Sequence, residues 1–388
     1  MTETNDLPAA AILPRVLFDT HGDCTLPVEN SVAPCPILLL PTELLIEIFL
    51  YVHSECHQKS SHIPEERVPD SEPEPPTHGI PVDPYSPSLF PYNVASVCKR
   101  WRNILCSLSF PTFWTQLVFI VGITTPEAIH EILSWSGTLP LELSVIQIDS
   151  LCPVGTDRPW YVELGDVKDV TRSILPQIKR FRTIKYSLTR SSSLAMARMT
   201  LVGKARMLQA LHMEYEEDDG DGGFEGQLCV PEPLEGRRPP FHGWKLITHN
   251  VKHLNVDNYT FKPACYLKSD GFHDLLHLRS LTLSWPHPRR HDEELITGGR
   301  GRVLFANFMQ VLQEAPMLTS LTVRNEQFDG MEPEKDFEVE YDLPCLRFVN
   351  FDGVSMRFVT HFHCSVNIDL ENLVIVHLSI SDSRVETF

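Results

Sequence analysis

Seven short stretches of the chain share one apolar pattern, and this repetition limits the fold more than any other feature. Each stretch has an apolar residue, two variable residues, an apolar residue, one variable residue and a third apolar residue. The last two apolar side chains fall on one face of a short strand. One such unit cannot bury its apolar side alone, whereas a stack can, so the sequence predicts a repeat domain. The stretches are Phe181/Ile184/Tyr186, Leu208/Leu211/Met213, Val251/Leu254/Val256, Leu278/Leu281/Leu283, Leu318/Leu321/Val323, Leu346/Val349/Phe351 and Leu373/Val376/Leu378.

The spacing of these stretches predicts strand-plus-helix units. Their starting positions are 27, 43, 27, 40, 28 and 27 residues apart, so four gaps nearly agree and the two longer ones contain loops. The segment 303–312 follows one of these loops and has the apolar spacing of a helix. We therefore expect a parallel sheet backed by irregular helices.

A different pattern precedes the repeats. Residues 40–49 read as a helix with Thr42 as N-cap and Glu43 in the first turn. Residues 54–90 hold eight prolines and are acidic, which predicts an extended or disordered insert. A second helix is expected after the N-cap Asn93. The apolar face of the first helix is formed by Leu44, Leu45, Ile48, Phe49 and Val52, and that of the second by Val94, Val97, Cys98, Trp101, Ile104 and Leu105.

Two further elements complete this part of the chain. A short element is expected at residues 111–114, where Phe113 and Trp114 follow Pro111. A helix is expected after Thr125, the cap before Pro126, and should end at Gly137. Residues 1–35 carry little apolar periodicity and are expected to be a flexible segment.

The formal net charge of -18 restricts the kind of partner. A nucleic-acid-binding protein needs a basic face, and an anionic membrane repels an acidic chain, so we expect protein partners and neither nucleic acid nor membrane. The longest basic cluster, Arg289, Arg290, Arg300 and Arg302, lies in an expected loop. The first residues do not have the pattern of a secretory signal, and the ten scattered cysteines suit free thiols, so we expect a cytoplasmic or nuclear protein.

Metal and catalytic sites are not expected. His53, Cys56, His57 and His62 have suitable chemistry for zinc, but their spacing fits no finger. His361, His363 and Cys364 are expected to alternate across a strand as ordinary sheet residues. The acidic run 214–222 lacks the glutamate that ends an EF-hand loop, since Leu228 stands there, and is expected to be a solvated loop. The chain has no nucleophile elbow, phosphate-binding loop or dinucleotide fingerprint, so no cofactor and no catalytic residue is assigned.

Two parts of the chain resemble known families. The motifs Leu40-Pro41-x-x-Leu44-Leu45-x-x-Ile48-Phe49 and Val97-Cys98-Lys99-Arg100-Trp101, followed by Phe113-Trp114, resemble the F-box over residues 36–120. The F-box is a three-helix module that docks on a Skp-type adaptor of a cullin–RING ubiquitin ligase. The resemblance implies adaptor-binding or core roles for Leu40, Pro41, Leu44, Leu45, Ile48, Phe49, Val97, Cys98, Trp101 and Trp114.

The repeats are similar to the leucine-rich repeats that often follow an F-box. They are degenerate, because the usual Asn or Cys after the strand is mostly missing, although Asn325 follows Leu321 and Val323 suitably. In that family the concave face and its loops hold the protein to be ubiquitinated.

These observations predict an α+β to α/β chain. An F-box-like module at 36–120, with the insert at 54–90, precedes a degenerate leucine-rich-repeat-like solenoid at 121–388. The leading hypothesis is a non-enzymatic substrate receptor of an SCF-type ubiquitin ligase. An interaction scaffold independent of the ligase and an enzyme with an unrecognised site remain as alternatives.

Overall fold

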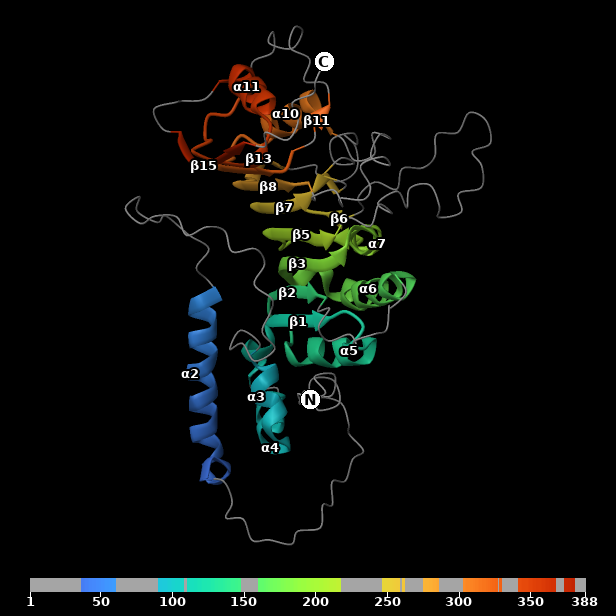
Figure 1. Cartoon of the computed structure of the whole chain (residues 1–388). Coiled ribbons are helices and arrows are strands. Elements are labelled where there is room, and N and C mark those ends of the chain that lie inside the picture. Colours follow the sequence, from blue (N-terminus) through green and yellow to red (C-terminus); the bar gives the residue numbers. More distant parts are fainter. Residues whose placement is uncertain are drawn as a thin grey trace, which may run out of the picture. The chain divides into compact units, whose positions relative to one another are not determined.

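The computed structural model forms two compact units (Figure 1). It describes residues 36–60, 90–107, 110–147, 160–217, 246–258, 260–261, 275–285, 303–326, 328–329, 341–367 and 373–380. The first unit comprises Met1–Val118, Ile123–Leu139 and Ile148–Asp157, and the second comprises Phe119–Gly122, Pro140–Gln147 and Arg158–Phe388.

The described part of the first unit is helical. Its elements are η2 (Pro36–Leu39), α2 (Thr42–Ser60), α3 (Tyr92–Val97), α4 (Lys99–Leu105), η4 (Pro111–Trp114) and α5 (Pro126–Trp135). The short element at 111–114 and the helix after Thr125 are confirmed. Thr42 is the first residue of α2 and not its N-cap, because the Pro41 carbonyl accepts the first helical hydrogen bond, from the Leu45 amide at 3.2 Å. The hydroxyl of Thr125 accepts a hydrogen bond from the Ala128 amide at 3.3 Å, as an N-cap should.

The expected start of the insert at residue 54 is wrong. Helix α2 continues to Ser60, because the first proline of this stretch is Pro64 and nothing before it prevents helical hydrogen bonding. Residues 61–89 of the insert, like the segment 1–35, lie outside the described residues.

The expected single helix after Asn93 is also wrong. The chain breaks at Cys98, whose φ of -161° and ψ of 165° are extended, and Asn93 lies inside α3. The Cys98 carbonyl accepts a hydrogen bond from the Arg102 amide at 3.1 Å and so begins α4 as a separate helix. The break turns Val97 to the surface while Trp101 is buried.

Aromatic side chains form the core of the first unit. The Trp101 ring packs edge-on against Phe49 with ring centroids 5.2 Å apart. Trp114 packs against Trp135 at 4.5 Å and donates a hydrogen bond from Nε1 to the Leu105 carbonyl at 2.8 Å. A buried indole with a satisfied N–H combines apolar burial with a fixed orientation.

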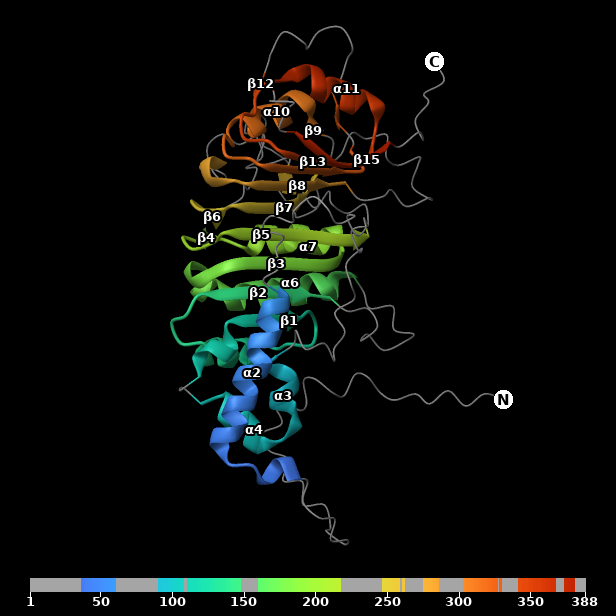
Figure 2. The same cartoon turned by 90° about the vertical axis from the view of Figure 1, so that its left-hand side faces the viewer.

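The second unit is built on a nine-stranded sheet, and the neighbouring strands from β2 onward are parallel. All seven predicted repeat stretches lie in or directly before strands of this sheet, which confirms the parallel sheet of an α/β fold (Figure 2). The spatial order of the strands follows the sequence. It runs β1 (Gln116–Ile120), β2 (Leu141–Ile146), β3 (Phe181–Arg190), β5 (Ala210–Glu217), β7 (His253–Asp257), β8 (Ser280–Ser284), β10 (Ser320–Arg324), β13 (Phe348–Val354) and β15 (Val374–Ile380).

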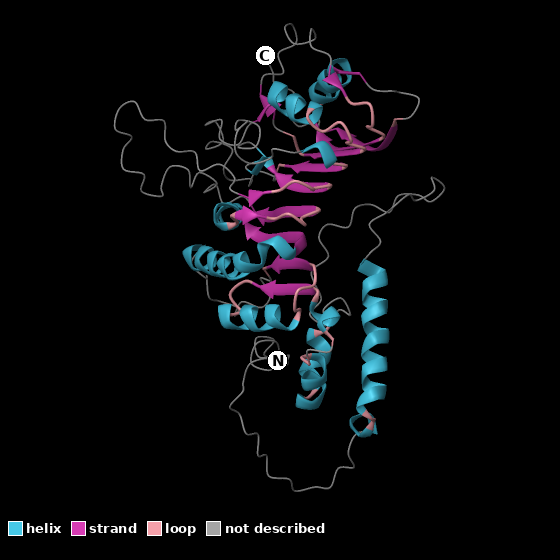
Figure 3. Cartoon of the chain, turned by 180° about the vertical axis from the view of Figure 1, so that it is seen from behind, coloured by secondary structure: helices cyan, strands magenta, loops and turns pink. Residues whose placement is uncertain are grey.

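Helices connect the strands and cover one side of the sheet, as α6 and α7 do in Figure 3. The predicted helix at 303–312 is present as α10. The other connecting elements are two-residue strand pairs and short turns. The helices are α6 (Trp160–Ile174), α7 (Ser191–Thr200), α10 (Phe305–Gln313) and α11 (Met356–Ser365); the strand pairs are β4 (Gly203–Lys204) with β6 (Leu246–Ile247), β9 (Val303–Leu304) with β11 (Phe328–Asp329), and β12 (Tyr341–Asp342) with β14 (Val366–Asn367); the turns are η6 (Leu175–Arg180) and η8 (Leu275–His277).

The assignment of His361, His363 and Cys364 to a strand is wrong, because they lie on α11. The Ser355 hydroxyl caps this helix by accepting a hydrogen bond from the Phe358 amide at 3.1 Å. Phe358, His361, Phe362 and Ser365 then form its buried face at helical spacing. His361 and His363, two positions apart, resemble strand alternation when the cap is overlooked.

A buried carboxylate joins α6 to α7. Glu163 accepts a short hydrogen bond from the Ser193 hydroxyl and lies 3.7 Å from Arg190 Nε. Ser193 is in the first turn of α7, where the helix dipole also favours a negative charge. The side chain of Glu163 is therefore compensated although it is buried.

The turn after β10 depends on a close contact between Asn325 and Gly353. Asn325 has a positive φ of 53°, donates its amide to the Asp352 carbonyl at 2.7 Å, and donates from Nδ2 to the Trp285 carbonyl at 3.3 Å. Gly353, also at positive φ, lies against this side chain, and a Cβ there would overlap Asn325 Oδ1. Asn325 thus bridges the ends of three neighbouring strands through β8, β10 and β13.

We predict that Gly353→Ala destabilises the second unit by about 1–3 kcal/mol, because the substitution imposes a positive φ on alanine and a clash with Asn325. Gly165→Ala is the matched control, since Gly165 lies in α6 with no atom within 4 Å of an added Cβ. That change should leave stability equal or raise it by up to about 1 kcal/mol. Urea unfolding measures both, and equal effects of the two substitutions would contradict the prediction.

Candidate interaction surfaces

The first unit exposes an apolar row along α2. Leu44 is 50% exposed and Ile48 is 38% exposed, and with Tyr51 they lie at helical spacing on one side. Val97, at the end of α3, is 56% exposed, and Leu39 is exposed before α2. We call Leu39, Leu44, Ile48, Tyr51 and Val97 the apolar row. Exposed large apolar side chains gathered on one module are typical of interaction surfaces.

The structure divides the ten residues expected to bind the adaptor into two groups. Leu45, Phe49, Trp101 and Trp114 are buried inside the first unit and support its surface from within. The other six are wholly or partly accessible: Pro41, Leu44, Ile48 and Val97 are exposed, and Leu40 and Cys98 are half-buried.

A hollow of about 660 Å³ lies between α2 and α4. Arg100 holds its two sides together by donating from Nη2 to the Leu40 carbonyl at 2.7 Å and to the Thr42 hydroxyl at 3.3 Å. This bond fixes the start of α2, where the apolar row begins. The lining residues are Thr42, Ile46, Lys99, Arg100, Asn103, Ile104, Ser107 and Phe110.

The second unit has a polar sheet face. Along the repeat strands from β3 to β13, the residues of the apolar pattern are buried toward the helices, and the residues that alternate with them are mostly half-buried. On the last strand, β15, Val376 and Leu378 of the pattern are exposed. The strand register aligns the alternating residues in rows across the sheet. One row is Lys185, His212, Asn255, Thr282, Thr322 and Asn350, and the row before it is Thr183, Ala210, His253, Ser280, Ser320 and Phe348.

The residues directly before the row that begins at Thr183 form a continuous ladder of backbone hydrogen bonds. In each repeat, the carbonyl of this residue accepts a hydrogen bond from the amide of the equivalent residue in the next repeat, at 2.6–2.9 Å. Four of the six residues are basic and none is acidic. We call this line the cationic column. It consists of Arg182, Gln209, Lys252, Arg279, Thr319 and Arg347.

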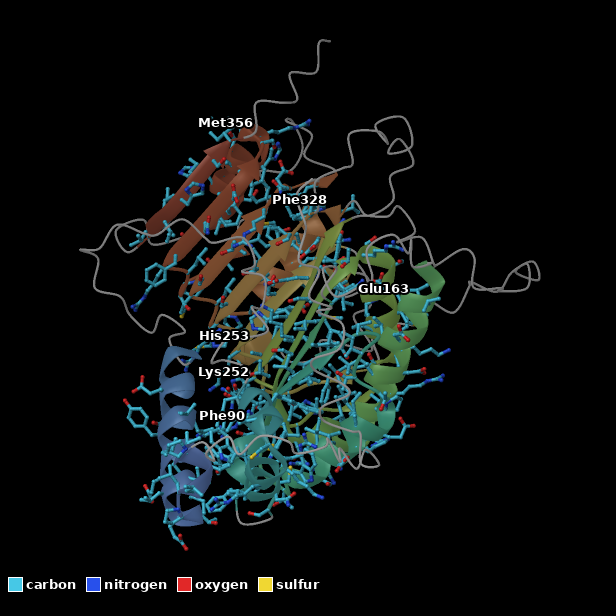
Figure 4. The ribbon with its side chains drawn as sticks, turned by 60° about the horizontal axis from the view of Figure 1, so that its bottom comes forward. Phe90, Glu163, Lys252, His253, Phe328 and Met356 are labelled. Carbon is cyan, nitrogen blue, oxygen red and sulfur yellow. The ribbon has the colours of Figure 1, made fainter. Side chains whose placement is uncertain are left out.

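The cationic column lies beside His253, whose pKa is lowered by two of its cations. Burial lowers the pKa of His253, and the nearby Lys252 and Arg279 lower it further. Burial also lowers the pKa of His212; Glu214 opposes that shift, while Lys185 and His253 add to it. Both imidazoles are therefore neutral at pH 7. Figure 4 places Lys252 and His253 together at the start of β7, away from Glu163 of α6.

Acidic side chains follow at the other end of the same strands. Glu214 accepts a short hydrogen bond from Asn255 Nδ2, and Asp257 is buried and accepts from the Thr260 amide at 3.1 Å. Asp352 lies 3.9 Å from His377. The strands thus begin on a basic side and end on a more acidic one, with the nearest carboxylates already engaged.

The cationic column is a surface feature that the sequence analysis missed. Its members are 27, 43, 27, 40 and 28 residues apart, so no basic cluster is visible along the chain. The signal is present when the repeats are aligned, because each member directly follows the first apolar residue of its stretch. The four basic residues of the column correct the expectation that the chain has no basic face. The basic cluster expected from the sequence, Arg289, Arg290, Arg300 and Arg302, lies outside the described residues.

The other expected sites have simple structural settings. His53 packs between Phe90 and Phe113, with ring centroids 5.5 and 5.4 Å away. Cys56 and His57 lie on α2, and His62 is outside the described residues. The expected loop at 214–222 is wrong for residues 214–217, because they continue β5 in register with β3, and residues 218–222 are outside the described residues. Within the described ranges, no three His, Cys, Asp or Glu side chains are grouped to hold a metal ion, and no helix is long and apolar enough to cross a membrane.

Comparisons with known proteins provide no family for this chain. Neither the models of protein families nor the curated proteins include a match to it.

We predict that His212 and His253 make the second unit less stable in acid. Unfolding restores their pKa toward the ordinary 6.5, so below that pH the unfolded chain binds more protons than the folded chain. The free energy of unfolding therefore decreases as the pH is lowered. The double variant His212→Gln/His253→Gln should lose less stability than wild type between pH 8 and pH 5.5 in urea unfolding. His249→Gln, which removes an exposed imidazole, is the control. An unchanged pH dependence in the double variant would contradict the prediction.

Proposed function

We propose that the chain is a substrate receptor of an SCF-type cullin–RING ubiquitin ligase. The first unit would dock on a Skp-type adaptor, and the sheet of the second unit would hold a target protein. Such a receptor acts by proximity, since it raises the local concentration of the target near the ligase, and it needs no catalytic residue of its own.

The observation that carries the proposal is the apolar row on the first unit. The motif residues divide between a packed interior, with Leu45, Phe49 and Trp101, and an exposed side with Leu44, Ile48 and Val97. A folded helical module gains little by exposing these side chains unless a partner covers them. Burial of Leu44 and Ile48 in an interface would contribute at about 25 cal/mol per Å² before the costs of association.

The sheet of the second unit supports the target-binding half of the proposal. Its polar rows offer hydroxyl, amide and imidazole groups from neighbouring strands, which suit a protein ligand. An interaction scaffold without the ligase is the second candidate, and the same sheet face supports it equally. The two candidates differ in whether the apolar row binds the adaptor.

We predict that Leu44→Asp and Ile48→Asp each abolish capture of a purified Skp-type adaptor. Each places a charge where an apolar interface would form, and we expect a loss of about 2 kcal/mol or more. Because both positions are exposed, the variants should fold like wild type by circular dichroism. His130→Asp, which adds one negative charge at an exposed position of α5, should bind normally. Leu45 is unsuitable for this test because its side chain is fully buried.

Pull-down with wild type and these variants decides between the candidates. Adaptor binding by wild type and His130→Asp, lost in folded Leu44→Asp and Ile48→Asp, supports the receptor. No binding by wild type, with the adaptor active toward another F-box protein, contradicts it and leaves the scaffold.

A further inference from the structure

We propose that the cationic column is the docking site for an extended acidic segment of the target protein. The inference deepens the proposed function by naming the chemistry of the target, and it rests on that function only in calling the ligand a ligase target. The docking itself needs only the second unit.

The column is a line of fixed geometry. Its members are successive rungs of one hydrogen-bonded ladder, and the sheet is in register directly after it. Adjacent strands lie about 4.8 Å apart, so the five intervals from Arg182 to Arg347 span about 24 Å. An extended peptide rises about 3.4 Å per residue, and about seven residues therefore cover the column.

The charge of the column is not neutralised by its neighbours. Arg182, Lys252, Arg279 and Arg347 form no ion pair in the part of the chain that the structure describes. Glu142 of β2 pairs with Thr183 beside Arg182 and already has a partner of its own, and Glu214 and Asp257, further along their strands, accept hydrogen bonds. The cations therefore remain available to an anionic ligand, although Lys252 is half-buried, which reduces the screening of its charge.

The groups beside the column can complete the binding of carboxylates. Ser280 and Ser320 follow Arg279 and Thr319 directly and are half-buried on the open face. Lys252 and Arg279 act on the charge of His253, so the N–H of neutral His253 is a hydrogen-bond donor close to these cations, and the two serine hydroxyls are further donors on the adjacent row. Charge-assisted hydrogen bonds from Arg and Lys to carboxylates are stronger than neutral ones.

The width and charge of the site favour a peptide over a nucleic acid. The column is one residue wide, and the acidic ends of the same strands would repel a second line of phosphates. The formal net charge of -18 opposes nucleic acid at longer range. A short acidic segment avoids both problems because it can place its carboxylates on the column alone and turn an uncharged side toward the strand ends.

The test uses the full chain and a fluorescein-labelled twelve-residue peptide of alternating Glu and Ala, measured by fluorescence polarisation at low salt. The matched probe has Gln in place of Glu. The test variant is the double charge reversal Lys252→Glu/Arg279→Glu. The control variant Arg206→Glu/Arg357→Glu makes the same change in charge at two exposed positions outside the column. A single-stranded oligonucleotide of equal charge competes for binding.

We expect wild type and the control variant to bind the Glu peptide, the Gln peptide to bind at least tenfold more weakly, and the column variant to lose at least tenfold in affinity. Equal losses in both variants would show a general charge effect and overturn the proposal. So would equal binding of the two peptides, or preferential binding of the oligonucleotide. Wild type that binds no probe overturns it as well, including the case in which the chain's own acidic segments occupy the column.

Adaptor capture by the column variant separates this inference from the proposed function. Lys252→Glu/Arg279→Glu leaves the first unit unchanged and should capture the adaptor like wild type. Loss of peptide binding with adaptor capture retained locates the defect in the second unit. Peptide binding by a chain that never captures the adaptor would support the column as a docking site and contradict the proposed role in a ubiquitin ligase.

Discussion

The second unit depends on the hydrogen-bonded ladder between parallel strands that follow one another in sequence. Each strand takes its register from the one before, since the amide at the start of one repeat bonds to the carbonyl at the start of the previous repeat. This arrangement places every repeat position in a line across the sheet. A line of buried leucines forms the core, and a line of exposed residues forms a surface. The cationic column, the polar rows and the aromatic packing under β13 all follow from this register.

The ladder also explains which parts of the second unit were predictable. The seven strands could be predicted because each repeats the same apolar pattern, whose alternate side chains are buried in every strand but β15. Helix α11 was mistaken for a strand because His361 and His363 are two positions apart, whereas the cap at Ser355 and the spacing of Phe358, His361 and Phe362 are those of a helix. Strands β1 and β2 were missed for a different reason. β1 has the same pattern at Trp114, Leu117 and Phe119, but Trp114 was assigned to the preceding helical module. In β2, Pro140 stands at the place of the first apolar residue, three positions before Leu143.

The helices of the first unit could be predicted from the sequence. Which of their apolar side chains are buried and which are exposed could not. The spacing of Leu44, Leu45, Ile48 and Phe49 predicts one apolar face, but that face is wide enough to supply both a core and a surface. Only packing decides the division: Phe49 meets Trp101, whereas Ile48 meets nothing that buries it. The extended backbone at Cys98 has the same effect on the second helix, since it separates Val97 from Trp101. A sequence motif therefore names the residues of such a module without saying which of them a partner can touch.

Net charge describes a chain poorly when its fold aligns distant residues. The formal charge of -18 belongs to the whole sequence, yet the register of the sheet gathers cations from positions 182, 252, 279 and 347 into one line with no anion in it. At a physiological ionic strength the Debye length is about 8 Å, so a ligand on the column senses the neighbouring cations more strongly than distant carboxylates. The same acidic background that repels polyanions at long range leaves a short acidic segment free to bind at close range. Selectivity for peptides over nucleic acids then follows from long-range repulsion by the net charge and short-range attraction by the column. It requires no contact that excludes nucleobases.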